Sequence, residues 1–229
     1  MDYLVSLLAS FLAVMVVITL HEFSHAFIAY KCGDPTAKWA GRMTLNPVKH
    51  FDPLGIVMFA LAGFGWAKPV PVNPNNFKHY RSGSFWTSAA GIIMNYISAF
   101  LFYPIYLLVL KYLVAGVGAA TYGHVLLNSF TYYLFAYSLS FCIFNLLPFY
   151  PLDGFRMVDA LNKKHGKVYW FLRRYGYYIL LGLILLSFVS QRLAFYVPFF
   201  GYLDILGYVM RFATNVLGWP IIKFWSLIF

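Results

Sequence analysis

The stretch YLVSLLASFLAVMVVITLHEFSHAFIAY, residues 3 to 30, decides the fold of this chain. It is apolar over more than the ~20 residues that cross a bilayer as a helix, and only HEFSH at 21 to 25 interrupts it. That pentapeptide contains Glu22, the single glutamate of the 229 residues. An ionised carboxylate in the middle of a membrane helix costs about 2.5 to 3.5 kcal/mol even on lenient insertion scales, which argues against a pure packing role for Glu22.

The composition places the rest of the chain in a membrane as well. Hydrophobic residues make up 62% of the sequence and charged residues 10%, whereas soluble proteins carry about 25% charged residues. The length suffices for one compact bundle of about five helices, without an added soluble domain. We therefore predict a single membrane-embedded domain over residues 1–229, with a core at 1–160 and C-terminal helices at 175–229.

Uninterrupted apolar runs predict an all-α polytopic membrane protein with about five to six transmembrane helices. Glycines at 116, 118 and 123 predict the turn between the second and third spans. Residues 53–72 are too short in apolar length for an ordinary span, so they favour a re-entrant loop or β-hairpin, with a simple interfacial loop as the alternative. The predicted spans cover residues 3–30, 85–110, 124–149 and 175–191, with one further span within 193–229.

The basic residues predict the orientation of these spans. Of the seventeen Lys and Arg, seven lie in residues 31–84 and six in 154–174. Both segments are therefore expected on the cytoplasmic side of the cell membrane, where anionic lipids attract them. The net charge of +10 thus belongs to the bilayer surface. We expect no nucleic-acid partner, because the charge is spread over short loops with no binding module to present it.

The motif HEFSH predicts a metal site at the cytoplasmic end of the bundle. His21 and His25 are four residues apart, so both imidazoles project from one face of a helix and reach a common ion. The first and third spans run in the same direction, and Asp153 follows the third span in NLLPFYPLDG, residues 145–154. Two histidines and this carboxylate would give three protein ligands and leave a fourth position for water, as in a catalytic zinc site. Glu22 is then the natural general base.

Other polar residues carry weaker signals. A bare H-E-x-x-H occurs by chance in many proteins, but its position inside an apolar span and the matching Asp153 favour a metal site. His50, His79 and His165 lie in basic loops and are expected to be solvated, and His124 is expected at the interface where the third span begins. Asp204 and Arg211, seven residues apart, are expected to pair or to face the bundle interior.

These residues resemble the site-2 proteases, zinc metalloproteases that cleave within or beside membrane-spanning segments of other proteins. The resemblance covers roughly residues 15–160 and depends on HEFSH, on NLLPFYPLDG, and on two tracts between them, GDPTAKWAGRMTLNPVKHFDPLG and GWAKPVPVNPNNFKH. A further signature of the family, A-G-P-x-x-N, is only approached by AAGIIMN, in which Ile92 stands where proline is usual. Nothing resembles the PDZ or CBS domains of some relatives, so a minimal form is expected.

The resemblance implies a role for each matching residue. His21, His25 and Asp153 are implied as ligands of Zn²⁺, and Glu22 as the catalytic base. Asn145 and Asn95 are implied near the active site, with oxyanion stabilisation or substrate positioning as their role and interhelical hydrogen bonding as the alternative. The implied partner is a membrane protein with a transmembrane helix, such as an anti-sigma factor, a membrane-tethered regulator or a remnant signal peptide.

Three classes of function are consistent with this pattern. An intramembrane zinc metalloprotease uses Glu22, the open metal position and the membrane setting together. A membrane metal transporter would also place histidine and carboxylate inside a bundle, but several sites or a repeat are expected there, and the sequence has one. A proteolytically silent membrane scaffold would commonly have lost a ligand or the base, whereas all four residues are present here.

Overall fold

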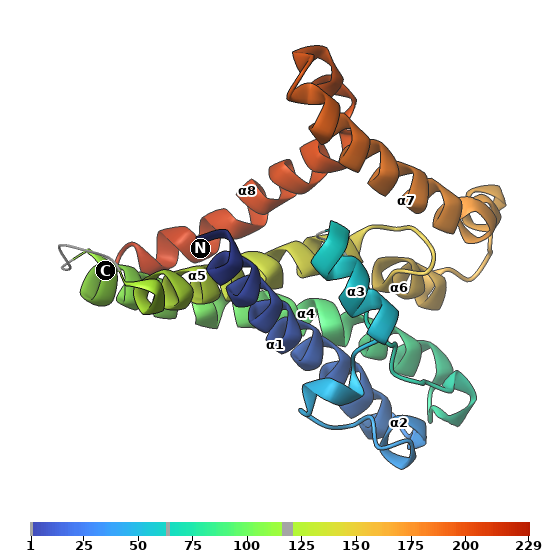
Figure 1. The fold of residues 1–229 in the computed structure, drawn as a ribbon. Coiled ribbons are helices and arrows are strands. Elements are labelled where there is room, and N and C mark those ends of the chain that lie inside the picture. Colours follow the sequence, from blue (N-terminus) through green and yellow to red (C-terminus); the bar gives the residue numbers. More distant parts are fainter. Residues whose placement is uncertain (1, 63–64, 116–120) are drawn as a thin grey trace.

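The computed structural model describes residues 2–62, 65–115 and 121–229 of the chain. Long helices dominate it, and short helical turns connect them (Figure 1). The elements in chain order are α1 (Asp2–Lys31), α2 (Thr36–Trp39), η1 (Pro47–Lys49), α3 (Pro53–Ala62), η2 (Pro74–Asn76), α4 (Tyr80–Val109), η3 (Leu110–Val114), α5 (Tyr122–Leu146), α6 (Asp153–Leu161), α7 (Lys167–Ala194), η4 (Pro198–Leu203) and α8 (Ile205–Trp225).

Helices α1, α4 and α5 form the centre of the molecule and pack against one another (Figure 1). Ala13 and Val17 of α1 are fully buried against Leu134 of α5. Because lipid tails are as apolar as leucine, polar contacts and close packing hold such helices together. Two hydroxyl pairs do so between α1 and α5, since Ser6 Oγ lies 2.9 Å from the Tyr133 hydroxyl and Ser10 Oγ 2.6 Å from that of Tyr137.

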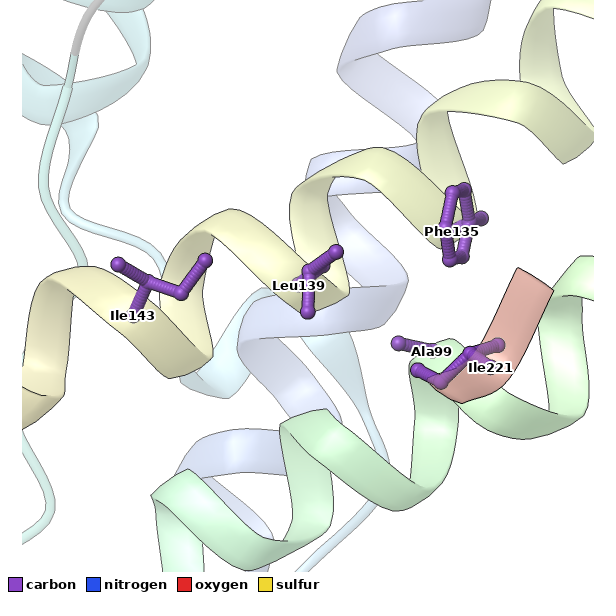
Figure 2. Close-up of a cluster of buried hydrophobic side chains, with 5 residues drawn as sticks. All are labelled: Ala99, Phe135, Leu139, Ile143 and Ile221. Atoms are coloured by element: carbon purple, nitrogen blue, oxygen red, sulfur yellow. The ribbon is translucent and has the colours of Figure 1, made fainter. Parts of the chain in front are cut away.

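The C-terminal part of α8 returns to this bundle. Figure 2 shows Phe135, Leu139 and Ile143, each four residues apart on α5, together with Ala99 of α4 and Ile221 of α8. Ile221 is 1% exposed, and the Trp225 indole donates a hydrogen bond to the Phe100 carbonyl of α4 at 2.9 Å. The end of α8 therefore packs on both α4 and α5. The division into a core at 1–160 and C-terminal helices at 175–229 stays a prediction.

Five helices of the described residues are long and apolar enough to cross a membrane, which confirms the predicted all-α polytopic fold. One of them lies in the last segment, as expected. Of the glycines assigned to the turn between the second and third spans, Gly116 and Gly118 lie outside the described residues, and Gly123 belongs to α5. The five helices run over Tyr3–Lys31, Tyr80–Val114, Tyr122–Leu146, Lys167–Ala194 and Ile205–Trp225.

The connection between α1 and α4 is fastened to the end of α1 by Asp34. Asp34 is fully buried, and its carboxylate accepts hydrogen bonds from the main-chain N–H of Asn73 at 2.7 Å and from Asn76 Nδ2 at 2.8 Å. Within residues 53–72 the structure has the helix α3, and Ala67 forms an isolated antiparallel bridge with Phe51, which precedes this stretch. A re-entrant course of this stretch through the bilayer stays a prediction.

One sequence-based expectation about this connection was wrong. His50 was expected to be solvated, but its side chain is fully buried. Its Nε2 lies 2.8 Å from the Thr44 carbonyl, and its own carbonyl accepts a hydrogen bond from the Lys68 amide. The basic residues around it suggested a solvated loop, but the chain folds back on itself there and His50 supplies polar contacts inside the fold.

Candidate metal centre

Three predicted ligand residues meet at one point between α1 and the start of α6. His21 Nε2 lies 3.0 Å from His25 Nε2, and Asp153 Oδ2 lies 3.3 Å and 3.1 Å from these two atoms. All three residues are buried. Proline residues at 148 and 151 end α5 and turn the chain, so that α6 begins at Asp153. A carboxylate in the first turn of a helix is favoured by the helix dipole.

Close packing of α6 on the end of α5 fixes the position of Asp153. A Cβ atom on the next residue, Gly154, would collide with the Leu146 carbonyl and would lie 2.7 Å from the carbonyl oxygen of Leu147. Only glycine therefore allows α6 to start this close to α5. Burial acts to raise the pKa of Asp153, but the positive charge that His25 and His21 carry when protonated lowers it by more, so the net pKa is below its usual range.

The arrangement of these donors fits zinc. A tetrahedral zinc site with metal–ligand distances of about 2.0–2.1 Å places its ligand atoms about 3.3 Å from one another. Among the described residues, Asp153 Oδ2 has no hydrogen bond of acceptable geometry, although it is buried. A buried carboxylate oxygen that lies 3.1–3.3 Å from two imidazole nitrogens is well placed to share a cation with them, and His₂Asp is a donor set that zinc accepts.

One face of α4 supports the two histidines from behind. His25 Nδ1 lies 2.6 Å from the Thr87 carbonyl, and His21 Nδ1 lies 3.0 Å from Asn95 Nδ2. Gly91 stands between Thr87 and Asn95 at four-residue spacing, and a Cβ atom there would lie 2.5 Å from His25 Nε2. α4 therefore reaches the imidazoles because residue 91 has no side chain. Outer partners of this kind orient metal-binding histidines.

Glu22 and Asn145 lie beside these residues. The Glu22 carboxylate accepts a hydrogen bond from the Val70 amide at 2.9 Å. Asn145 Nδ2 donates to the Phe141 carbonyl of its own helix at 3.1 Å, and its side chain lines the cavities at the site. The predicted catalytic and positioning roles of Glu22, Asn145 and Asn95 are not settled by this placement and stay predictions.

Two cavities meet at this centre. A cavity of about 500 Å³ is bordered largely by apolar side chains, among them Phe11, Val14 and Ile18 of α1. A second cavity, of about 550 Å³, reaches from the histidines and Asp153 to Arg156 and Arg173. Five residues border both cavities: His21, Glu22, Pro69, Asn145 and Leu152. The metal centre therefore lies where an apolar space joins a more polar one.

Sequence reasoning assigned no structural role to Thr87, Val70, Gly91 or Gly154, although the two glycines belong to the motifs AAGIIMN and NLLPFYPLDG. Thr87 and Val70 contribute main-chain groups, which every residue type carries, so no motif marks them. The two glycines contribute the absence of a side chain. The spacing of Thr87, Gly91 and Asn95 at intervals of four was the available signal, because such residues share one face of a helix.

Comparisons with known proteins bear on the same residues. The model of the family described as Peptidase family M50 matches residues 9–188. The chain belongs to peptidase family M50. This is the site-2 protease family, so the resemblance seen in the sequence is confirmed, and this M50 protein is a multi-pass membrane metalloprotease with zinc as its cofactor.

Curated relatives of this M50 peptidase are named as zinc metalloproteases. YwhC of Bacillus subtilis (strain 168) is 43% identical over 162 residues, which cover 70% of this chain and 69% of YwhC. Rip2 of Mycolicibacterium smegmatis is 26% identical over 215 residues, which cover 90% of this chain and 76% of Rip2. No solved structure matches this chain.

Proposed function

We propose that this M50 peptidase hydrolyses peptide bonds in or near transmembrane segments of other membrane proteins, with Glu22 as the general base. The observation that carries the proposal is the position of Glu22. It adjoins the three ligand residues, and it borders both the apolar cavity and the polar one. A segment that passes from the membrane toward water through these cavities brings its backbone to the ligand residues and the carboxylate together.

The residues of the chain divide the chemistry among them. His21, His25 and Asp153 would hold zinc, whose Lewis acidity activates water near neutral pH and polarises a carbonyl. The Val70 amide holds one oxygen of the Glu22 carboxylate in place. Glu22 takes a proton from the water that attacks the scissile carbonyl carbon. It then passes that proton to the amide nitrogen as the carbon–nitrogen bond breaks.

The segment from Lys68 to Val72 limits how a substrate strand can pair with it. Prolines at 69 and 71 have no N–H, and the N–H groups of Lys68 and Val70 donate to the His50 carbonyl and to Glu22. The main chain of residues 68–71 therefore has no N–H group left to donate to a substrate strand. We infer that an unwound substrate strand pairs here by donating its own N–H groups to carbonyl oxygens of this segment.

The substrates we propose are membrane proteins with a transmembrane helix, such as anti-sigma factors, membrane-tethered regulators or remnant signal peptides. A helix must unwind before its peptide bonds become accessible, because its carbonyls are already hydrogen-bonded. The first candidates for the cleavage site are the substrate residues at which the transmembrane helix emerges on the cytoplasmic side of the cell membrane. Arg156 and Arg173 of the basic segment 154–174 line the polar cavity, which supports a site directed toward the cytoplasm.

The test compares wild type with Glu22→Gln in liposomes that contain a model membrane substrate. We expect cleavage to fall by about 10²- to 10⁴-fold, because general base catalysis contributes about that much, while the zinc content stays at that of wild type. Cleavage by Glu22→Gln at the wild-type rate would contradict the proposed role. A metal transporter would keep its zinc flux in the variant, and a silent scaffold would cleave nothing in either form.

The substrate itself can be found in cells. Membrane fragments that accumulate with wild type and not with Glu22→Gln identify physiological substrates by mass spectrometry. We expect such fragments to end within or beside a transmembrane segment. Ends confined to soluble loops far from any membrane segment would contradict the proposed substrate class.

A further inference from the structure

Asn95 of α4 lies behind the metal centre, on the side of His21 away from His25 and Asp153. Its side chain is fully buried, and its amide approaches His21 Nδ1 at 3.0 Å. In the described part of the chain, no group donates a hydrogen bond to Asn95 Oδ1. A buried amide oxygen that accepts no hydrogen bond destabilises the fold, so in this orientation of the amide Oδ1 still needs a hydrogen-bond donor.

The hydrogen bond of the neighbouring His25 identifies which of its ring nitrogens carries the proton. The Thr87 carbonyl can only accept, so His25 Nδ1 at 2.6 Å must carry the proton. The lone pair of His25 is then on Nε2, which faces His21 Nε2 and Asp153 Oδ2. His25 is therefore held in the tautomer that binds a metal through Nε2.

His21 must adopt the same tautomer to share that metal. Its Nε2 faces Asp153 Oδ2 at 3.3 Å, so its proton belongs on Nδ1, and Nδ1 then needs an acceptor. The Asn95 amide has an oxygen and a nitrogen of nearly equal size, and a half-turn of the amide exchanges them. That half-turn places Oδ1 at the proton of Nδ1 and supplies the donor that Oδ1 lacks.

We propose that Asn95 is a positioning residue that accepts a hydrogen bond from His21 Nδ1–H and so fixes the tautomer and ring orientation of this zinc ligand. This inference rests on the metal site of the proposed function and not on proteolysis. It differs from an oxyanion role, because the amide is engaged with the histidine and not with the substrate. Outer partners of this kind typically change metal affinity by about 10- to 100-fold.

Two substitutions at residue 95 separate an acceptor from a donor. Asn95→Leu keeps a similar volume and removes both polar atoms, and we expect zinc affinity to fall by about 10- to 100-fold. Asn95→Asp keeps an acceptor and loses the donor, so we expect affinity equal to or tighter than that of wild type. The control is Asn128→Leu on α5, which removes another amide whose Oδ1 has no hydrogen bond within the described residues, and it should bind zinc as wild type does.

The readouts are the zinc dissociation constant of the purified full chain, measured by competition with a chromophoric chelator, and the visible spectrum of the Co²⁺-substituted protein. Wild-type affinity in Asn95→Leu would overturn the proposal. Weakened zinc affinity in Asn95→Asp would also overturn the proposal, since it would mean that residue 95 donates a hydrogen bond to His21. If Asn95→Leu does not fold, the Asn95→Asp variant alone decides the question. Normal zinc binding without cleavage of any substrate would remove the proposed function and leave this inference standing.

Discussion

At the scale of single residues, Gly91 determines how closely α4 approaches the metal ligands. A Cβ atom on residue 91 would lie 2.5 Å from His25 Nε2 and 2.7 Å from His21 Nδ1. Both distances are shorter than any ordinary carbon–nitrogen contact, so the imidazoles would have to move. The missing side chain is therefore as much a part of the site as the ligands.

We expect Gly91→Ala to weaken zinc binding by at least about tenfold, because displaced imidazoles no longer meet Asp153, and to destabilise the fold by about 1–3 kcal/mol through overpacking. Metal content and thermal unfolding in detergent measure the two effects. The matched control is Gly182→Ala on α7, where, apart from its chain neighbours and the adjacent backbone of the helix itself, no atom of the described residues lies within 4 Å of the added methyl group and helix propensity favours alanine. Equal zinc binding in both variants would show that α4 tolerates the methyl group.

Whether a site residue could be predicted from the sequence depends on whether it contributes a distinctive side chain or only its main chain. His21, Glu22 and His25 could be selected from the sequence because charged and metal-binding groups are expensive in a membrane and rare there, and the catalytic role of Glu22 stays a prediction. Asp153 was predictable from a matching helix direction, and the structure brings it to the histidines. Thr87 and Val70 were not predictable, since their carbonyl and amide are present in every residue. His50 was mispredicted because burial depends on how a long connection folds back.

At the scale of elements, Asp204 joins α7 to α8. It is 2% exposed, and it accepts hydrogen bonds from Ser187 Oγ at 2.6 Å, the Gly207 amide at 2.8 Å and Gln191 Nε2 at 3.1 Å. Arg211 lies 3.5 Å away, which confirms the predicted pairing of these two residues. Burial acts to raise the pKa of Asp204, but the hydrogen bonds and Arg211 lower it more, so the net pKa is below its ordinary value.

This lowered pKa predicts a pH-dependent contribution to stability. A carboxylate whose folded pKa is depressed stabilises the fold above its unfolded pKa, about 3.9 for aspartate, and loses that effect as the pH falls through the folded value. We expect Asp204→Asn to lower the unfolding temperature at pH 7 and to differ less from wild type at pH 3. Unfolding in detergent, followed by circular dichroism at both pH values, measures this. A gap of the same size at pH 3 would contradict the prediction.

The elements also differ in how readily they are predicted. The long apolar helices were expected, and the last segment contains a single helix of spanning length, α8. The short elements α2, η1 and η2 were not foreseen. They depend on local contacts such as the buried Asp34 carboxylate, which ties residues 73 and 76 to the end of α1. Such contacts join residues far apart in the sequence and leave no periodic pattern.

At the scale of the whole molecule, the two basic segments lie toward the same end of the bundle. Figure 1 shows α2 and α6 away from the N-terminus of the chain, at the end where α1 finishes and α4 begins. The metal centre joins the C-terminal half of α1, which leads to α2, to Asp153 at the start of α6. The arrangement of helices thus fits a topology with both basic segments on one side of the membrane, and the assignment of that side to the anionic cytoplasmic leaflet stays a prediction.

This agreement predicts the labelling of single cysteines in intact cells. With Cys32 and Cys142 replaced by serine, Lys38→Cys and Lys163→Cys should react with a membrane-impermeant maleimide only after the cells are opened. Thr121→Cys, at the start of α5, should react in intact cells, because the orientation predicted from the basic segments places the start of α5 on the outer side of the membrane. Reaction of residues 38 and 163 in intact cells would reverse the topology.

The ligands of the metal come from distant parts of the chain, and this separation has a consequence during synthesis. A ribosome releases residues 21 to 25 into the bilayer well before residue 153 emerges. A nascent chain, or a product truncated before α6, therefore contains Glu22, His21 and His25 but lacks Asp153. The three ligand residues can therefore meet only once the third span has been inserted and the chain has turned back to place Asp153 beside the histidines.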